Sequence, residues 1–363
     1  MEDKVTDNNN AKLNMEEFMK KFVKLFITFR LMRVALIVLG VLTLAGLAFF
    51  RNAFPVLGSI FVLFGLTTLI IWLKLKHDWN LVAGPAGYLE KWDKRYGSLH
   101  KNIRYGKGRR NLLDLYIPKD ADKNKPQPVM LFIHGGGWSG GNKSGMAFAA
   151  AKFAKVGYIT ATMSYSLTSK TKPEVTASTM IDEITACIAR IKEAAAEQGY
   201  LADKISLSGH SAGGHLSLFY AYTQADNSPI PIAFVFEQVG PVSFFPEFWN
   251  GDKKIALGFA SALTGKKITA EMLEAGEADE LIHSISPLNH VSPNSVPTLF
   301  AYGGKDTTVP PIHGEKLKEA LELNQVPHVW IVFPNSSHMM AEDPDYTVKY
   351  YEEVKIFAQQ HFA

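Results

Sequence analysis

Two long apolar runs distinguish the first hundred residues from the rest of the chain. Residues 31–50 contain a single charge, and residues 53–73 contain none. Each run is long enough to cross a bilayer as a helix, and the Arg-Asn step at 51–52, with Pro55 close behind, is typical of a tight reversal. We therefore predict a two-helix transmembrane hairpin over residues 31–76. A cleaved signal peptide is the alternative, but its charged leader would be unusually long and a second apolar run follows.

The flanks of this hairpin are basic and amphipathic. In residues 1–30, apolar side chains recur at helical spacing, which predicts a cytoplasmic or interfacial amphipathic segment or, equally, an extension of the first span. Lysine and arginine lie before the first run and after the second, whereas Arg51 alone lies in the turn. The positive-inside rule then places both flanks in the cytoplasm. The sequence predicts a two-span protein of the cell membrane, with a linker at 77–95 and a cytoplasmic C-terminal domain.

From residue 96 to residue 363 the pattern changes to short apolar runs that alternate with amphipathic stretches. Such alternation is typical of an α/β domain with a mostly parallel sheet covered by helices on both faces. The expected strands are 112–117, 128–133, 158–163, 205–208, 232–239, 298–302 and 329–333, and the clearest helices are 179–198 and 212–223.

Composition narrows the chemistry of this domain. A net charge of +3, with evenly spread basic residues, does not predict a nucleic-acid partner. The single cysteine, Cys187, excludes an intrachain disulfide and is expected to be a buried helix residue. The histidines lack the spacing of zinc ligands, and residues 140–144 (GGNKS) lack the spacing of a nucleotide-binding loop. We therefore expect no metal and no cofactor.

A Gly-x-Ser-x-Gly motif (GHSAG, 209–213) lies between an expected strand and an expected helix. In this context flanking glycines permit a strained turn that exposes the hydroxyl of Ser211 as a nucleophile. The alternative is a glycine-rich turn in which Ser211 only caps the helix. A serine hydroxyl needs a base, an orienting acid and oxyanion donors to react at neutral pH.

Candidates for all three parts follow other expected strands. The motif HGGGW at 134–138 would present backbone N–H groups, and we assign Gly136, Gly137 and Ala212 as oxyanion donors. His338, after the strand that ends at 333, is the expected base. Asp306, after the strand that ends at 302, is the expected acid, since Ser, Asp, His is the required chain order.

The assignment of the acid has alternatives in the sequence, and three further histidines near the motifs are expected to have other roles. Asp306 could be a simple turn aspartate, and Glu237 and Asp343 are the reserve acids. His134 and His210 belong to the backbone motifs, where such residues more often shape loops than titrate. Another histidine, His215, is expected inside a helix.

Taken together, the motifs at 134–138, 209–214 (GHSAGG), 286–291 (SPLNHV) and 303–306 (GGKD) resemble the esterase and lipase branch of the α/β-hydrolase fold. The resemblance is strongest to the hormone-sensitive-lipase-like and feruloyl-esterase-like carboxylesterases, and it covers residues 96–363. It implies hydrolysis of a small or lipid-like carboxylic ester through an acyl-enzyme, with Ser211, Asp306 and His338 as the triad.

Several functional alternatives stay open at this stage. The same triad could cleave amides, as an amidase or peptidase, and a non-catalytic membrane-tethered binding protein could reuse the fold. Residues 243–283 are a possible lid insertion, whose aromatic side chains either line an acyl pocket or pack the insertion onto the sheet. The oligomeric state is open as well.

Overall fold

The computed structural model of the protein describes residues 92–169 and 171–363. The predicted hairpin, the amphipathic segment before it and most of the predicted linker lie outside these residues. Within the described part of the chain, no helix is both long enough and apolar enough to span a bilayer.

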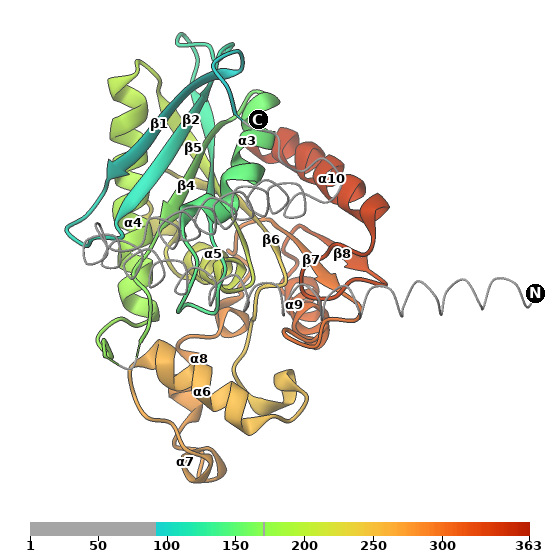
Figure 1. The fold of residues 1–363 in the computed structure, drawn as a ribbon. Coiled ribbons are helices and arrows are strands. Elements are labelled where there is room, and N and C mark those ends of the chain that lie inside the picture. The colour runs from blue at the N-terminus through green and yellow to red at the C-terminus, as the bar shows by residue number, and fades with distance from the viewer. Residues whose placement is uncertain (1–91, 170) are drawn as a thin grey trace, which may run out of the picture. The chain divides into compact units, whose positions relative to one another are not determined.

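In the described part of the chain, eight strands form one sheet in the order β1-β2-β4-β3-β5-β6-β7-β8 (Figure 1). Only β2 runs against its neighbours; from β4 to β8 every adjacent pair is parallel. The strands are β1 (Gly97–Arg104), β2 (Leu112–Pro118), β3 (Gln127–Ile133), β4 (Ile159–Ser164), β5 (Ala202–His210), β6 (Ile232–Gln238), β7 (Thr298–Gly303) and β8 (His328–Phe333). This sheet confirms the predicted α/β domain with a mostly parallel sheet.

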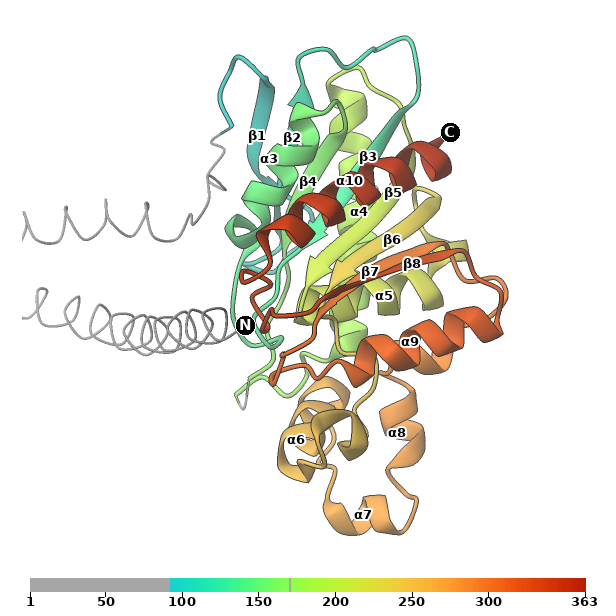
Figure 2. The same cartoon turned by 90° about the vertical axis from the view of Figure 1, so that its right-hand side faces the viewer.

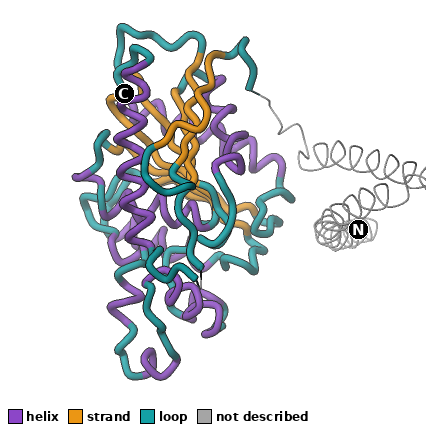
Figure 3. Tube along the Cα trace, turned by 60° about the vertical axis from the view of Figure 1, so that its left-hand side comes forward, coloured by secondary structure: helices purple, strands orange, loops and turns teal. Residues whose placement is uncertain are grey.

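Helices cover both faces of the sheet (Figures 2 and 3). One face carries α3 and α10, and the other carries α4, α5 and α9. The bounds of the helices are α3 (Ala147–Lys155), α4 (Ala177–Glu197), α5 (Ala212–Thr223), α6 (Lys253–Thr264), α7 (Ala270–Glu274), α8 (Asp279–His283), α9 (Ile312–Leu323) and α10 (Pro344–Phe362). Strands buried on both faces are mostly apolar along their whole length, which explains the continuous apolar run in β3.

The helix α4 shows how the pattern produces the packing. Isoleucines recur on one face of its sequence, and Ile184, Ile188 and Ile191 have no exposed surface. Cys187 lies on the same helix and is fully buried, as expected. Thr176 caps the helix by accepting the backbone N–H of Thr179, so the helix begins where the apolar periodicity begins.

The segment between β6 and β7 forms a small helical insertion at one end of the domain. It contains α6, α7 and α8, which lie beside the loops that follow the parallel strands (Figures 1 and 2). Of its aromatic side chains, Phe244, Phe248 and Trp249 are buried. These three pack the insertion onto the domain, which is one of the two roles that the sequence left open.

Candidate active site

The predicted site residues all follow the carboxyl ends of parallel strands. Gly136 and Gly137 come after β3, Ser211 after β5, Asp306 after β7 and His338 after β8. Because parallel strands end at the same edge of a sheet, residues far apart in sequence meet there.

Ser211 occupies a strained turn between β5 and α5. Its backbone has φ 58° and ψ −122°, a conformation that costs a non-glycine residue on the order of 1–3 kcal/mol. Glycine is required on both sides: a Cβ on Gly209 would lie 2.2 Å from the carbonyl carbon of Gly213, and a Cβ on Gly213 would lie 2.0 Å from the carbonyl oxygen of Ile133. The Ser211 side chain makes no capping hydrogen bond, so the helix-cap alternative is wrong.

A chain of two hydrogen bonds joins the three predicted residues. His338 Nε2 lies 2.9 Å from Ser211 Oγ, and His338 Nδ1 lies 2.7 Å from Asp306 Oδ2. The imidazole can therefore accept the serine proton through Nε2 while its Nδ1–H donates to the carboxylate.

Asp306 is held by its own loop. It is only 3% exposed, and its other oxygen, Oδ1, accepts the backbone N–H groups of Thr308 and Val309 at 2.8 and 2.9 Å. Asp306 is thus both a turn aspartate and a partner of His338, because one carboxylate oxygen shapes the turn and the other contacts the imidazole. The same turn fixes the rotation of the carboxylate.

The two reserve acids lie elsewhere. Glu237 is fully buried on β6, and its Oε2 accepts the backbone N–H of Gly240 at 2.6 Å. Burial raises the pKa of the Glu237 carboxyl well above its usual range. Asp343 accepts hydrogen bonds from Asn335 and Ser336. Neither acid is bonded to His338.

The loop that carries His338 is tied at several points. Asp343 accepts hydrogen bonds from Asn335 and Ser336, the first residues of this loop. Burial raises the pKa of the Asp343 carboxyl, but these hydrogen bonds together outweigh burial, so the pKa lies below its usual value. Glu342 accepts the side-chain and backbone donors of Ser337. His210 Nε2 donates to the carbonyl of His338 itself at 2.9 Å, and burial lowers the pKa of His210 to about 4, so this imidazole is neutral. His210 therefore shapes the loop, as its place in the motif indicated.

The glycine loop after β3 lies against the serine. A Cβ on Gly135 would lie 2.5 Å from the carbonyl oxygen of His210, so only glycine allows this approach. Gly136 and Gly137 have φ of 115° and 57°, in the left-handed region that glycine favours. Within residues 92–169 and 171–363, the backbone N–H groups of these two glycines and of Ala212 donate no hydrogen bond. They are free to bind an oxyanion.

Two side chains that the sequence did not point to hold this loop. Tyr165, directly after β4, donates its hydroxyl to the carbonyl of His134 at 2.9 Å, and its ring stacks on the His134 imidazole. Arg110 donates to the carbonyls of Tyr165 and Gly141. Both residues lie outside any motif, and their role depends on the antiparallel pairing of β2 with β4, which no local pattern reveals.

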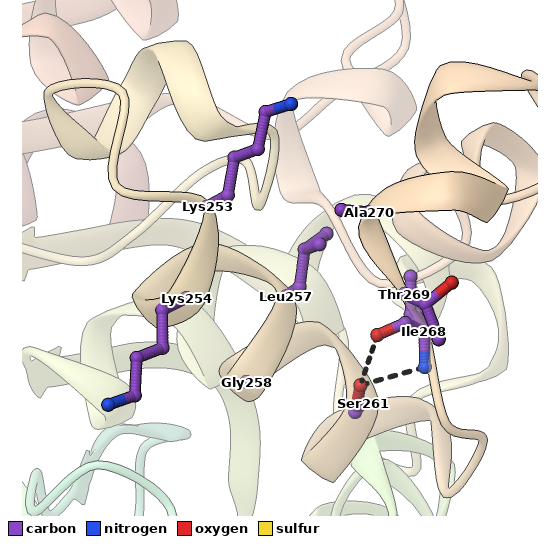
Figure 4. Close-up of a pocket in the computed structure, with 8 residues that line it drawn as sticks. All are labelled: Lys253, Lys254, Leu257, Gly258, Ser261, Ile268, Thr269 and Ala270. Carbon is purple, nitrogen blue, oxygen red and sulfur yellow. Dashed lines mark hydrogen bonds between the residues drawn. The ribbon is translucent and has the colours of Figure 1, made fainter.

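A separate pocket of about 390 Å³ lies within the insertion, between α6 and α7 (Figure 4). Leu257 and Ile268 form part of its lining, and Ser261 there already bonds the backbone of Ile268. Lys253 at its edge is paired with Glu274 at 2.8 Å. None of the predicted site residues lines this pocket. In the described ranges, no group of three or more His, Cys, Asp or Glu side chains could hold a metal ion.

Known proteins resemble this domain in sequence. The relatives include a probable carboxylic ester hydrolase, LipM, of Mycobacterium tuberculosis, which is 27% identical over 65% of this chain and 55% of that protein. A probable isoprenylcysteine alpha-carbonyl methylesterase, ICME, of Oryza sativa is 34% identical over 34% of this chain and 29% of that protein. The chain thus spans about half the length, or less, of these curated relatives.

Solved structures and a family model agree on the fold. Esterase B from Lactobacillus rhamnosis has a TM-score of 0.60 at 20% identity and covers 80% of this chain and 95% of that one. A truncated carbohydrate esterase from gut microbiota has a TM-score of 0.63 at 20% identity and covers 75% and 99%. Both likenesses show the α/β-hydrolase fold. The BD-FAE family model matches residues 113–321, more than half of the 363 residues, and the chain therefore belongs to the BD-FAE family.

Proposed function

We propose that the protein is a serine hydrolase that cleaves carboxylic esters. The observation that carries this proposal is the hydrogen-bond chain from Ser211 through His338 to Asp306, which lies beside the glycine loop after β3. Nucleophile, base, orienting acid and oxyanion donors are the four parts that acyl transfer requires.

The geometry supports a two-step reaction. In the first step Ser211 Oγ attacks the ester carbonyl carbon while His338 Nε2 takes the hydroxyl proton, and the carbonyl oxygen becomes an oxyanion bound by Gly136, Gly137 and Ala212. His338 then gives the proton to the departing alcohol, which leaves an acyl ester on Ser211. In the second step water attacks this ester with His338 again as base, and the acid is released as Ser211 regains its proton.

The relatives support an ester rather than an amide as the substrate. Those named above carry the names of ester hydrolases, and the solved neighbours are esterases. We propose a small or lipid-like ester.

A fluorophosphonate probe tests the mechanism. Wild-type protein should be labelled on Ser211, as read by peptide mass spectrometry, because the probe phosphorus mimics the attacked carbonyl. Ser217→Ala is the matched control: Ser217 lies on the same helix, is fully buried and only donates to the carbonyl of Gly213. It should be labelled like the wild type, and Ser211→Ala should not be labelled at all. Absence of label in the wild type, or faster cleavage of anilides than of the matching esters, would refute the ester hydrolase proposal.

We further propose that residues 31–76 tether the domain to the cytoplasmic face of the cell membrane. Two apolar runs with basic residues on both outer flanks support this proposal. An added protease should leave the C-terminal domain intact in sealed right-side-out vesicles and digest it after lysis. Digestion before lysis would contradict a cytoplasmic domain, and release of the protein by alkaline carbonate would contradict the spans.

A further inference from the structure

His215 connects three parts of the candidate site, namely α5, the glycine loop after β3 and the insertion between β6 and β7. It lies one helical turn after Ser211, and its backbone N–H donates to the carbonyl of Ser211 at 3.0 Å. Its side chain has no exposed surface. The proposed reaction gives this residue no role, yet both of its ring nitrogens are engaged.

The partners of the ring define a single tautomer. An indole N–H can only donate, so His215 Nδ1, which lies 3.1 Å from Trp138 Nε1, must be the acceptor. The proton therefore resides on Nε2, which donates to the carbonyl of Ile285 at 2.8 Å. Burial lowers the pKa of His215 to about 4, so the ring is neutral over the working range of an esterase.

Trp138 connects His215 to the glycine loop after β3, which carries the proposed oxyanion donors Gly136 and Gly137 and is called the oxyanion loop below. It follows Gly137 directly, is 2% exposed and has φ of 56°, a left-handed conformation that a tryptophan adopts only under constraint. Its carbonyl accepts the backbone N–H of Thr168 at 2.9 Å, and its ring packs on the rings of His215, Phe244 and Phe259 with centroids 5.2–5.6 Å apart. A shift of Trp138 would rotate the peptide groups that precede it.

We propose that His215 is a positioning residue whose Nδ1 lone pair holds Trp138, and through it the N–H groups of Gly136 and Gly137, in the geometry that binds the oxyanion. The carbonyl of Ile285, which follows α8 of the insertion, fixes the ring so that Nδ1 faces the indole. This inference rests on the proposed ester hydrolase function. It assigns the insertion a part in catalysis, as a support of the oxyanion loop.

Two substitutions separate the roles of the two ring nitrogens. His215→Asn places an amide oxygen near the position of Nδ1 and keeps the acceptor for Trp138, whereas His215→Gln places an amide nitrogen near Nε2 and keeps only the donor for Ile285. For a nitrophenyl ester, we expect His215→Gln to lower kcat by about 10- to 100-fold with KM changed less than about threefold, since a misplaced oxyanion donor acts on the transition state. His215→Asn should stay within about fivefold of the wild type.

Trp138→Phe removes the donor and keeps an aromatic ring. It should match His215→Gln, and the double variant should be no slower than either single one, because both changes break the same contact. His313→Gln is the matched control. His313 is as buried as His215, packs on Phe248 and Trp249 and accepts the backbone N–H of Val242. Loss of this imidazole should lower the unfolding midpoint of the protein and leave kcat within about threefold of the wild type. Equal kcat in His215→Asn and His215→Gln, or additive losses in the double variant, would overturn the proposal.

A second measurement does not depend on activity. In full-length protein labelled with ¹⁵N at the indole nitrogens, the Trp138 N–H should exchange slowly with solvent in the wild type and in His215→Asn, and much faster in His215→Gln. Equal exchange in all three would overturn the proposed contact even if the protein hydrolysed no ester. Wild-type protein that hydrolyses esters while the two variants behave alike would refute the role of His215 and leave the proposed function intact.

Discussion

Ser211→Ala and His338→Ala should each lower kcat for ester hydrolysis by about 10⁴- to 10⁶-fold, and the double variant should be no slower than either single variant. The reason is the 2.9 Å hydrogen bond between Ser211 Oγ and His338 Nε2. A hydroxyl without its base is a poor nucleophile, and a base without the hydroxyl has nothing to activate, so the two side chains act as a unit. The residual rate should reflect the oxyanion donors and substrate binding alone.

Steady-state kinetics on one nitrophenyl ester, with the active fraction of the wild type titrated by the fluorophosphonate probe, would measure these losses. KM should change little, because the unit acts on the transition state. Ser217→Ala again controls for a change of serine to alanine on the same helix. If the losses of the two single variants multiplied in the double variant, Ser211 and His338 would be acting independently, and the proposed mechanism would be wrong.

The sequence predicted the central elements because their patterns are local. The strand before GHSAG, the helix after it and the order of Ser211, Asp306 and His338 follow from motifs a few residues long. Predicted bounds agree within a few residues: the helix at 212–223 is α5 as predicted, and the strand at 205–208 is the middle of the longer β5. The extra residues of β5 are explained by pairing, since Ala202 lies opposite Gln127 of β3.

Features that depend on pairing between distant segments were not predicted. The edge strand β1 is half exposed along most of its length, so it lacks a clear alternation of buried and exposed residues, and it is defined by its antiparallel pairing with β2. The same holds for Tyr165 and Arg110, whose hydrogen bonds to the oxyanion loop arise only once the sheet has formed. His215 was correctly expected inside a helix, but its link to Trp138 joins residues 77 positions apart.

Asp306→Asn should lower kcat by about 10⁴-fold while the fold is retained. The turn around Asp306 gives the reason. Oδ1 accepts two backbone N–H groups, from Thr308 and Val309, so in the variant this position must remain an oxygen and the new NH₂ group must face His338. An NH₂ group can only donate, so His338 Nδ1 would become the acceptor and the imidazole proton would move to Nε2. That nitrogen would then point an N–H at Ser211 Oγ and could no longer take its proton.

Glu237→Gln is the matched control for this change of acid to amide. The amide has nearly the same shape as the Glu237 carboxyl, whose pKa is raised well above its usual range by burial, and the amide oxygen can still accept the N–H of Gly240. Its kcat should stay within about threefold of the wild type. Kinetics of the two variants on the same ester distinguish the acids, provided that both variants keep the wild-type circular dichroism spectrum. A large loss in Glu237→Gln with Asp306→Asn near wild type would make Glu237 the orienting acid, and the 2.7 Å contact between Asp306 and His338 would then have no part in catalysis.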